Sequence, residues 1–160
     1  MKHLLLTILL LSACDEVMSI DLSASDHEFI EDFFDGQIDD VHYFESDRLE
    51  PDGRAIGNTV IFASRVNVKA HMRQRPLIVR ELTHVLQWQR KEWGSKDEGY
   101  YFGLWDNDSI KDYGTEQQAE IMSAYYLISY DTLPYSCVDC DEYPMELITE
   151  RLTELYEEML

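Results

Sequence analysis

A short run near the middle of the chain has the residue types and spacing of a zinc-dependent hydrolytic site with one ligand replaced. Residues 80–84 read Arg-Glu-Leu-Thr-His. In the complete pattern, His-Glu-x-x-His, two histidines one helical turn apart hold zinc, and the glutamate between them takes a proton from the metal-bound water. Glu81 and His84 are in place, but Arg80 replaces the first histidine. A guanidinium is permanently charged and has no lone pair for a metal.

The run must lie on a helix for its side chains to converge, and the sequence predicts one over residues 76–93. Proline suits the first helical position, and apolar residues then recur three and four apart, which indicates one buried face. Glu81, His84 and Trp88 share a neighbouring face. A β-branched and aromatic run at residues 58–62 predicts a strand ahead of this helix.

The remaining elements are predicted from caps, turns and periodicity. Ser25 and Glu28 fit a capping box, so a short helix should begin there and end near Gly36. A further strand is expected at residues 41–44. Two more helices are expected at residues 115–130, again with a capping box, and after Pro144, where an apolar stripe repeats every three or four residues. The predicted fold class is α+β, mostly helical, with a small sheet packed against the helix at residues 76–93.

Three segments together resemble one known family. They are Gly-Asn-Thr-Val-Ile-Phe at residues 57–62, Glu-Leu-Thr-His-Val-Leu-Gln at residues 81–87 and Glu-Gln-Gln-Ala-Glu-Ile at residues 116–121. In this order they are similar to small zincin-like domains associated with bacterial secretion and toxin systems, whose active helix reads roughly H-E-x-T-H-V-W-Q. The resemblance covers about residues 53–130. It implies a zincin-like fold with an active-site helix, a glutamate-bearing helix and metallopeptidase-related ancestry.

The resemblance also implies a role for each matching residue. Glu81 corresponds to the general base, while His84 and Glu116 correspond to metal ligands for zinc. Glu120 corresponds to a carboxylate that supports the first ligand through a hydrogen bond. Arg80 stands at the degenerate ligand position, and this departure puts zinc binding in doubt.

Two arrangements around Arg80 stay open. His42 or His71 could substitute as a ligand and keep the metal, and His71 lies in the loop just ahead of the helix. Alternatively, the Arg80 cation fills the place of the metal and pairs with Glu116, because a buried carboxylate without a partner is costly. In the second arrangement no metal cofactor is needed.

The N-terminus resembles the export signal of a bacterial lipoprotein. A mostly apolar run at residues 4–11 is too short to span a bilayer as a helix, and Leu-Ser-Ala-Cys at residues 11–14 is similar to a lipobox. We expect lipid on Cys14, which would hold the protein on a membrane of the bacterial cell envelope, facing the periplasm. An ordinary signal peptide with an unrelated cysteine is the alternative. The expected organisation is a signal peptide at residues 1–13, a tether at 14–24 and a single zincin-like domain at 25–160.

The two remaining cysteines, Cys137 and Cys140, favour a disulfide in an oxidising compartment. Half of a zinc knuckle is a weaker alternative, because the sequence has no second cysteine pair to complete it. A redox motif is a third alternative, but the strand-then-helix setting typical of such motifs is not predicted here.

The charge balance excludes one class of partner and leaves another open. The formal net charge is −19, so nucleic acid is a poor partner. Residues 53–100 are locally basic, with nine Lys or Arg against four acids, which indicates either an acidic ligand or pairing with the chain's own acidic flanks. Two functions remain: a lipid-anchored metallopeptidase-like protein with an impaired site, and a non-catalytic lipoprotein that binds a protein or peptide partner.

Overall fold

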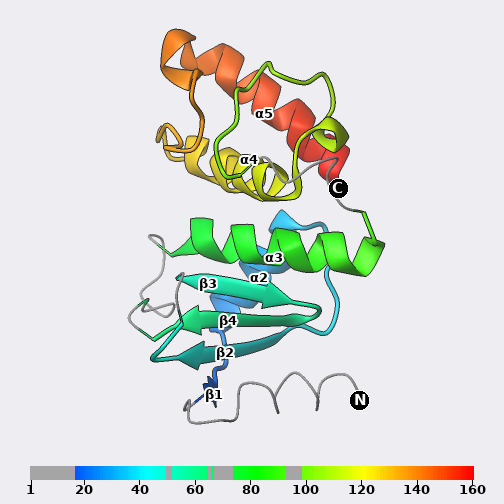
Figure 1. The fold of residues 1–160 in the computed structure, drawn as a ribbon, viewed down its shortest axis with the longest axis vertical. Coiled ribbons are helices and arrows are strands. Elements are labelled where there is room, and N and C mark those ends of the chain that lie inside the picture. The colour runs from blue at the N-terminus through cyan, green and yellow to red at the C-terminus, as the bar shows by residue number, and fades with distance from the viewer. Residues whose placement is uncertain (1–16, 50–51, 65, 67–73, 93–98) are drawn as a thin grey trace.

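The structure is a computed structural model that describes residues 17–49, 52–64, 66, 74–92 and 99–160, and structural statements below concern these residues (Figure 1). They form an α+β fold with a four-stranded mixed sheet, and helices hold many more residues than strands. The elements are β1 (Val17–Ser19), α2 (Ala24–Phe33), β2 (His42–Ser46), β3 (Gly53–Ile56), β4 (Thr59–Ala63), α3 (Arg75–Arg90), η2 (Ile110–Asp112), α4 (Thr115–Ile128), η3 (Cys140–Glu142) and α5 (Met145–Met159).

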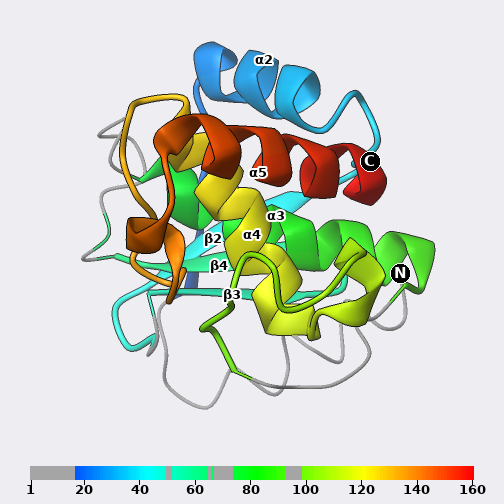
Figure 2. The ribbon, with the colours of Figure 1, turned by 90° about the horizontal axis from the view of Figure 1, so that it is seen from above.

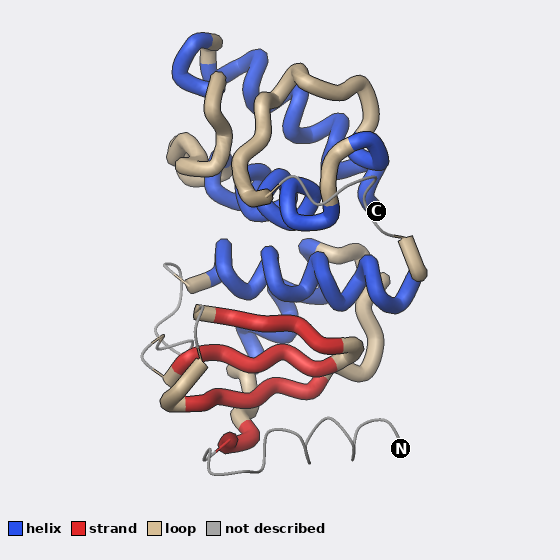
Figure 3. Tube along the Cα trace, in the orientation of Figure 1, coloured by secondary structure: helices blue, strands red, loops and turns tan. Residues whose placement is uncertain are grey.

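The elements stack from the sheet towards the C-terminal helices. Helix α3 lies between the sheet and α4, and α5 lies beyond α4 (Figure 1). Figure 3 shows the strands gathered at one end of the molecule. Helix α2 lies behind α3 in Figure 1 and at the margin of the helices in the view from above (Figure 2), and its Phe33 ring contacts Tyr156 of α5. The expected small sheet against the helix that carries Arg80 and His84 is therefore present.

The sheet places an edge strand beside α3. The strand order is β1-β2-β4-β3, with β2 and β4 parallel and the other two pairs antiparallel. All five residues of β4 are buried, as expected for a β-branched and aromatic strand in the interior of a sheet. The β3–β4 hairpin turns at Gly57, whose φ of 59° lies in the left-handed region that glycine adopts readily. Strand β3 is left at the edge of the sheet, in contact with α3.

Helix α3 is close to its predicted position and packs through the predicted face. It begins at Arg75 and its left-handed C-terminal residue is Lys91, so it stops earlier than expected from residues 76–93. Its buried apolar residues pack against α4 and the sheet; they are Ile78, Val79, Leu82, Val85 and Leu86.

Two helix starts differ from the sequence prediction. Ser23, and not Ser25, caps α2, because the Ser23 hydroxyl accepts a hydrogen bond from the backbone N–H of Asp26. Helix α4 is capped one residue earlier than predicted, with the Gln117 side chain accepting a hydrogen bond from the backbone N–H of Gly114. The side chain of Gln118 is thereby released from capping and turns into the interior.

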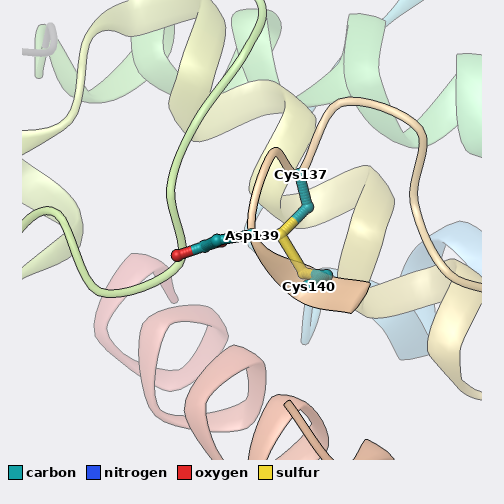
Figure 4. Close-up of side chains that lie close together, drawn as sticks. All are labelled: Cys137, Asp139 and Cys140. Carbon is teal, nitrogen blue, oxygen red and sulfur yellow. Dashed lines mark hydrogen bonds between the residues drawn. A yellow bond between two sulfur atoms is a disulfide. The ribbon is translucent and has the colours of Figure 1, made fainter. Parts of the chain in front are cut away.

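The expected disulfide joins Cys137 and Cys140 in the loop ahead of α5 (Figure 4). None of the helices among the described residues combines the length and apolar character needed to cross a membrane.

Candidate functional site

A cleft of about 480 Å³ opens between the edge strand and the facing helices α3 and α4. Glu81, His84 and Trp88 of α3 all line it, which agrees with their predicted common face. Glu116 at the start of α4 lines it as well. The lining residues are Gly53, Arg54, Ala55, Ile56, Gly57, Arg80, Glu81, His84, Trp88, Tyr100, Thr115 and Glu116.

One half of the cleft lies nearer the C-terminal end of α3 and contains His84; we call it the His84 half. Two side chains hold His84 there. Its Nε2 lies 3.2 Å from Oε2 of Glu116, and its Nδ1 lies 2.8 Å from Oε1 of Gln87. The Gln87 oxygen can only accept, so Nδ1–H of His84 donates to it. Nε2 therefore bonds the Glu116 carboxylate only when a proton lies between them, which makes this contact an imidazolium–carboxylate pair.

Gln87 is the residue that fixes this orientation, and the sequence prediction gave it no role. It is fully buried, and its amide nitrogen donates to the backbone oxygen of Thr115 at 3.1 Å and to Oε1 of Gln118 at 2.8 Å. Gln118 in turn donates to the backbone oxygens of Ile110 and Tyr113. One signal was available in the sequence, because Gln87 is three residues after His84 and so shares its helical face.

The pKa shifts of His84 and Glu116 agree with an ion pair between a protonated imidazole and an ionised carboxylate. Burial pulls the pKa of His84 down, but the hydrogen bond and negative charge of Glu116 outweigh it, so the pKa is raised above 6.5. The hydrogen bond from His84 lowers the pKa of Glu116, against the opposing effect of burial. The two shifts have opposite signs, as expected for an attractive pair of an acid and a base.

The other half of the cleft lies nearer the N-terminal end of α3 and contains Arg80; we call it the Arg80 half. The Arg80 guanidinium lies between two carboxylates there. Its nitrogens are 3.4 Å from Oε1 of Glu81 and 3.6 Å from Oε1 of Glu120, and it also lies 5.0 Å from the centre of the Tyr100 ring. Glu81 is only 1% exposed and packs under Gly53 of the edge strand. Burial raises the pKa of Glu81, while the charge of Arg80 lowers it less.

The expected pair between Arg80 and Glu116 is replaced by a different pairing. Among the described residues, Arg80 pairs with Glu81 and Glu120, and Glu116 pairs with His84. The physical reason is that α3 and α4 run antiparallel. The residue one turn before His84 on α3 therefore faces the residue one turn after Glu116 on α4. Position 80 therefore faces Glu120, where the resemblance places the supporting carboxylate.

The residues that the structure describes do not make a complete zinc site. His84 and Glu116 offer two donors, whereas catalytic zinc uses three protein ligands. Among the described residues, no third histidine, cysteine or carboxylate joins them within 4.8 Å. The substitute ligand His71 and the expected lipid attachment at Cys14 lie outside the described residues.

A second group of metal-binding atoms lies in the disulfide loop. The donor atoms of Cys137, Asp139 and Cys140 lie within 4.8 Å of one another (Figure 4). These sulfurs are bonded to each other, so they have no thiolate to offer a metal until the disulfide is reduced. The loop therefore serves as the structural link expected from the sequence.

Comparisons of the chain with protein-family models, with curated proteins and with solved structures found no match. Function must therefore be inferred from the residues of the cleft and from the three segments that resemble zincin-like domains. Among these residues, the pairing of Arg80 is the most informative, because it decides what chemistry Glu81 can do.

Proposed function

We propose that the chain is a zincin-like domain that binds a ligand in its cleft and no longer carries out metal-dependent hydrolysis. The observation that carries this proposal is the position of Arg80, whose guanidinium lies 3.4 Å from the Glu81 carboxylate and 3.6 Å from that of Glu120. A general base must reach a water that a metal has made acidic. Glu81 faces a permanent cation instead, so its charge is neutralised without catalysis.

The cleft is suited to an extended polypeptide segment. Strand β3 forms one wall and lies at one of the two edges of the sheet, where a peptide can add main-chain hydrogen bonds beside the Ala55 N–H that already bonds Glu81. Two aromatic side chains in the lining are well exposed, Trp88 at 53% and Tyr100 at 46%. Aromatic residues of this kind supply much of the contact energy in protein interfaces.

Metal-dependent peptide hydrolysis is a second candidate, favoured by one distance. The donor atoms of His84 and Glu116 are 3.2 Å apart. Two ligands of one tetrahedral zinc, each at about 2.1 Å from the ion, are separated by about 3.4 Å. This half of the cleft could thus hold a metal if a third ligand were supplied, for example by His71.

Zinc content of the full chain distinguishes the two functions. We expect no stoichiometric zinc in the parent and about one zinc per chain in an Arg80→His variant, since three ligands suffice for a catalytic site. An Arg54→His variant is the matched control, because Arg54 lines the cleft but lies on β3 and outside the ligand position. Stoichiometric zinc in the parent, together with hydrolysis of an unfolded protein substrate, would overturn the binding function.

We also propose that the protein is anchored in the bacterial cell envelope by lipid on Cys14. The support is the apolar run followed by Leu-Ser-Ala-Cys at residues 11–14. Labelling of growing cells with a radioactive fatty acid should mark the parent and fail to mark a Cys14→Ser variant. Equal labelling of both proteins would contradict lipid attachment at this residue.

A further inference from the structure

A second surface, away from the residues of the cleft, concentrates exposed apolar side chains. Eight of the twelve exposed large apolar residues among those described fall between Tyr101 and Leu147. They lie mainly on two loops that run side by side, because Phe102 pairs with Cys137 in a parallel bridge and the Asp139 side chain accepts a hydrogen bond from the backbone N–H of Leu104 (Figure 4). Two pairs of these residues are in contact, Tyr101 with Tyr135 and Trp105 with Tyr143, and exposed apolar clusters can mark interaction sites.

At one end of these loops is a small pocket with an aromatic wall. Trp105 and Tyr143 lie with ring centroids 3.9 Å apart, and Leu147 of α5 adjoins them. Trp105 is 40% exposed, Tyr143 39% and Leu147 47%. The pocket has a volume of about 280 Å³, just below the range of roughly 300–1,000 Å³ that is usual for small-molecule sites. Its size suits one long side chain of a partner.

The rest of the pocket wall is charged and has an excess of acid. Glu150 and Glu154 are one helical turn apart on α5 and both line it, together with Arg151. Arg151 is already committed, since it bonds the backbone oxygens of Leu104, Asn107 and Asp108 and pairs with Glu154 at 2.9 Å. Among the described residues Glu150 has no ion pair. Arg151 is therefore the one cation that the described residues contribute to the pocket wall, beside the carboxylates of Glu150 and Glu154. Its hydrogen bonds hold the loop that contains Leu104, Asn107 and Asp108.

Charge and shape together select the occupant. From Asp139 to Glu158 the chain has eight acids and a single basic residue, Arg151. An anionic membrane or an acidic protein would be repelled, whereas a cation would be attracted to Glu150 and Glu154 and to the faces of the two aromatic rings. The stem of a lysine or arginine would lie along Leu147 and Trp105.

We propose that this pocket is a docking site for a partner protein that presents a lysine or arginine side chain beside an apolar residue. The apolar residue contacts the surrounding loops, and the basic side chain fills the pocket and pairs with Glu150 and Glu154. The disulfide between Cys137 and Cys140 holds one loop, and Arg151 holds the other. The surface is therefore preorganised, which lowers the cost of ordering it on binding.

The test uses the full chain and the peptide acetyl-Leu-Arg-Leu-amide, with the same peptide carrying citrulline as the uncharged control. The readout is the NMR signal of the Trp105 indole N–H, assigned by its loss in a Trp105→Phe variant. We expect a saturable shift with the arginine peptide and at least about fivefold weaker binding with citrulline or in a Glu150→Gln, Glu154→Gln double variant. A Glu150→Gln single variant, which keeps the pair of Arg151, should fall in between.

A matched control separates local from overall charge. Glu146 and Glu157 are exposed acids on α5 outside the pocket, so their double change to glutamine should alter the dissociation constant less than twofold. Equal weakening in the two double variants, or equal binding of the citrulline peptide, would overturn the proposal. A shift of the Trp88 indole in place of that of Trp105 would place the peptide in the other cleft and also overturn it. So would a Trp105 shift produced by phosphatidylcholine vesicles and not by the peptide.

Discussion

The two halves of the cleft neutralise their carboxylates in different ways. Around His84, both ring nitrogens have a directed hydrogen bond, and the bonds continue from Glu116 through the imidazole to Gln87 and on to Gln118. Around Arg80, contacts are longer ion pairs, and Oε1 of Glu81 and Nε of Arg80 have no hydrogen-bond partner among the described residues. One half is a precise network and the other is mainly charge compensation. The difference shows that directed hydrogen bonds fix the side chains of the His84 half, whereas opposite charges hold those of the Arg80 half.

The largest effect should come from removing the cation of the Arg80 half. An Arg80→Met variant leaves Glu81 buried without its partner, so we expect a loss of about 3 kcal/mol in the free energy of unfolding. Arg54→Met is the control, since Arg54 is exposed, and should change stability by less than about 0.5 kcal/mol. Urea unfolding measures both. Equal losses would mean that the Arg80 ion pairs contribute nothing specific.

The next effect concerns the directed network of the His84 half. Gln87→Ala removes a buried amide with three hydrogen bonds, and we expect a loss of about 2 kcal/mol. Gln89 on the same helix bonds Asp39 and Asn58 near the surface, where water can replace the lost partner. Gln89→Ala should therefore cost about 0.5 kcal/mol. If Gln89→Ala were the more damaging, the network would not be the stabilising feature of this half.

A smaller effect should follow from crowding Glu81 against the edge strand. A Cβ added at Gly53 would meet Cγ of Glu81 at 2.9 Å. Because Glu81 is packed between the strand and α3, Gly53→Ala should destabilise by about 1–2 kcal/mol. In a protein that already carries Glu81→Ser, the Gly53→Ala change should no longer destabilise. Thermal melts of the Glu81→Ser variant and of the double variant would show this. An undiminished cost would mean that Gly53 serves the strand itself.

The smallest effect is the pH dependence of the His84–Glu116 pair. The raised pKa of His84 gives stability that is present below pH 6.5 and is lost as pH rises through the folded value. The lowered pKa of Glu116 gives stability that is present above pH 4.5 and is lost as pH falls. The pair should thus stabilise most between pH 4.5 and 6.5, by about 1 kcal/mol or less, because both side chains are partly exposed and water screens their charges. The measurement is the free energy of unfolding of the parent and of a His84→Gln, Glu116→Gln double variant, from below to above this pH range. The difference between the two proteins should be largest between pH 4.5 and 6.5. A difference that does not change with pH would contradict the prediction.

Local patterns identified much of the fold. The apolar stripes of α3 and α5 and the β-branched run of β4 were predicted near their observed positions, because a buried face imposes a period on the sequence. Two helix starts were predicted at the wrong residue. Ser23 and Gly114 cap their helices although Ser25 and Thr115 also fit the pattern, since neighbouring polar residues compete for the same role.

The sequence by itself determined which residues are available for the cleft: Glu81, His84 and Trp88 share a face of α3 because of helical periodicity alone. Only the tertiary structure decided which partner each residue has. The antiparallel packing of α3 on α4 sets Arg80 against Glu120 and His84 against Glu116, and it buries Gln87 between them. Pairings between helices depend on their relative direction and register, and neither is encoded in the periodicity of one helix.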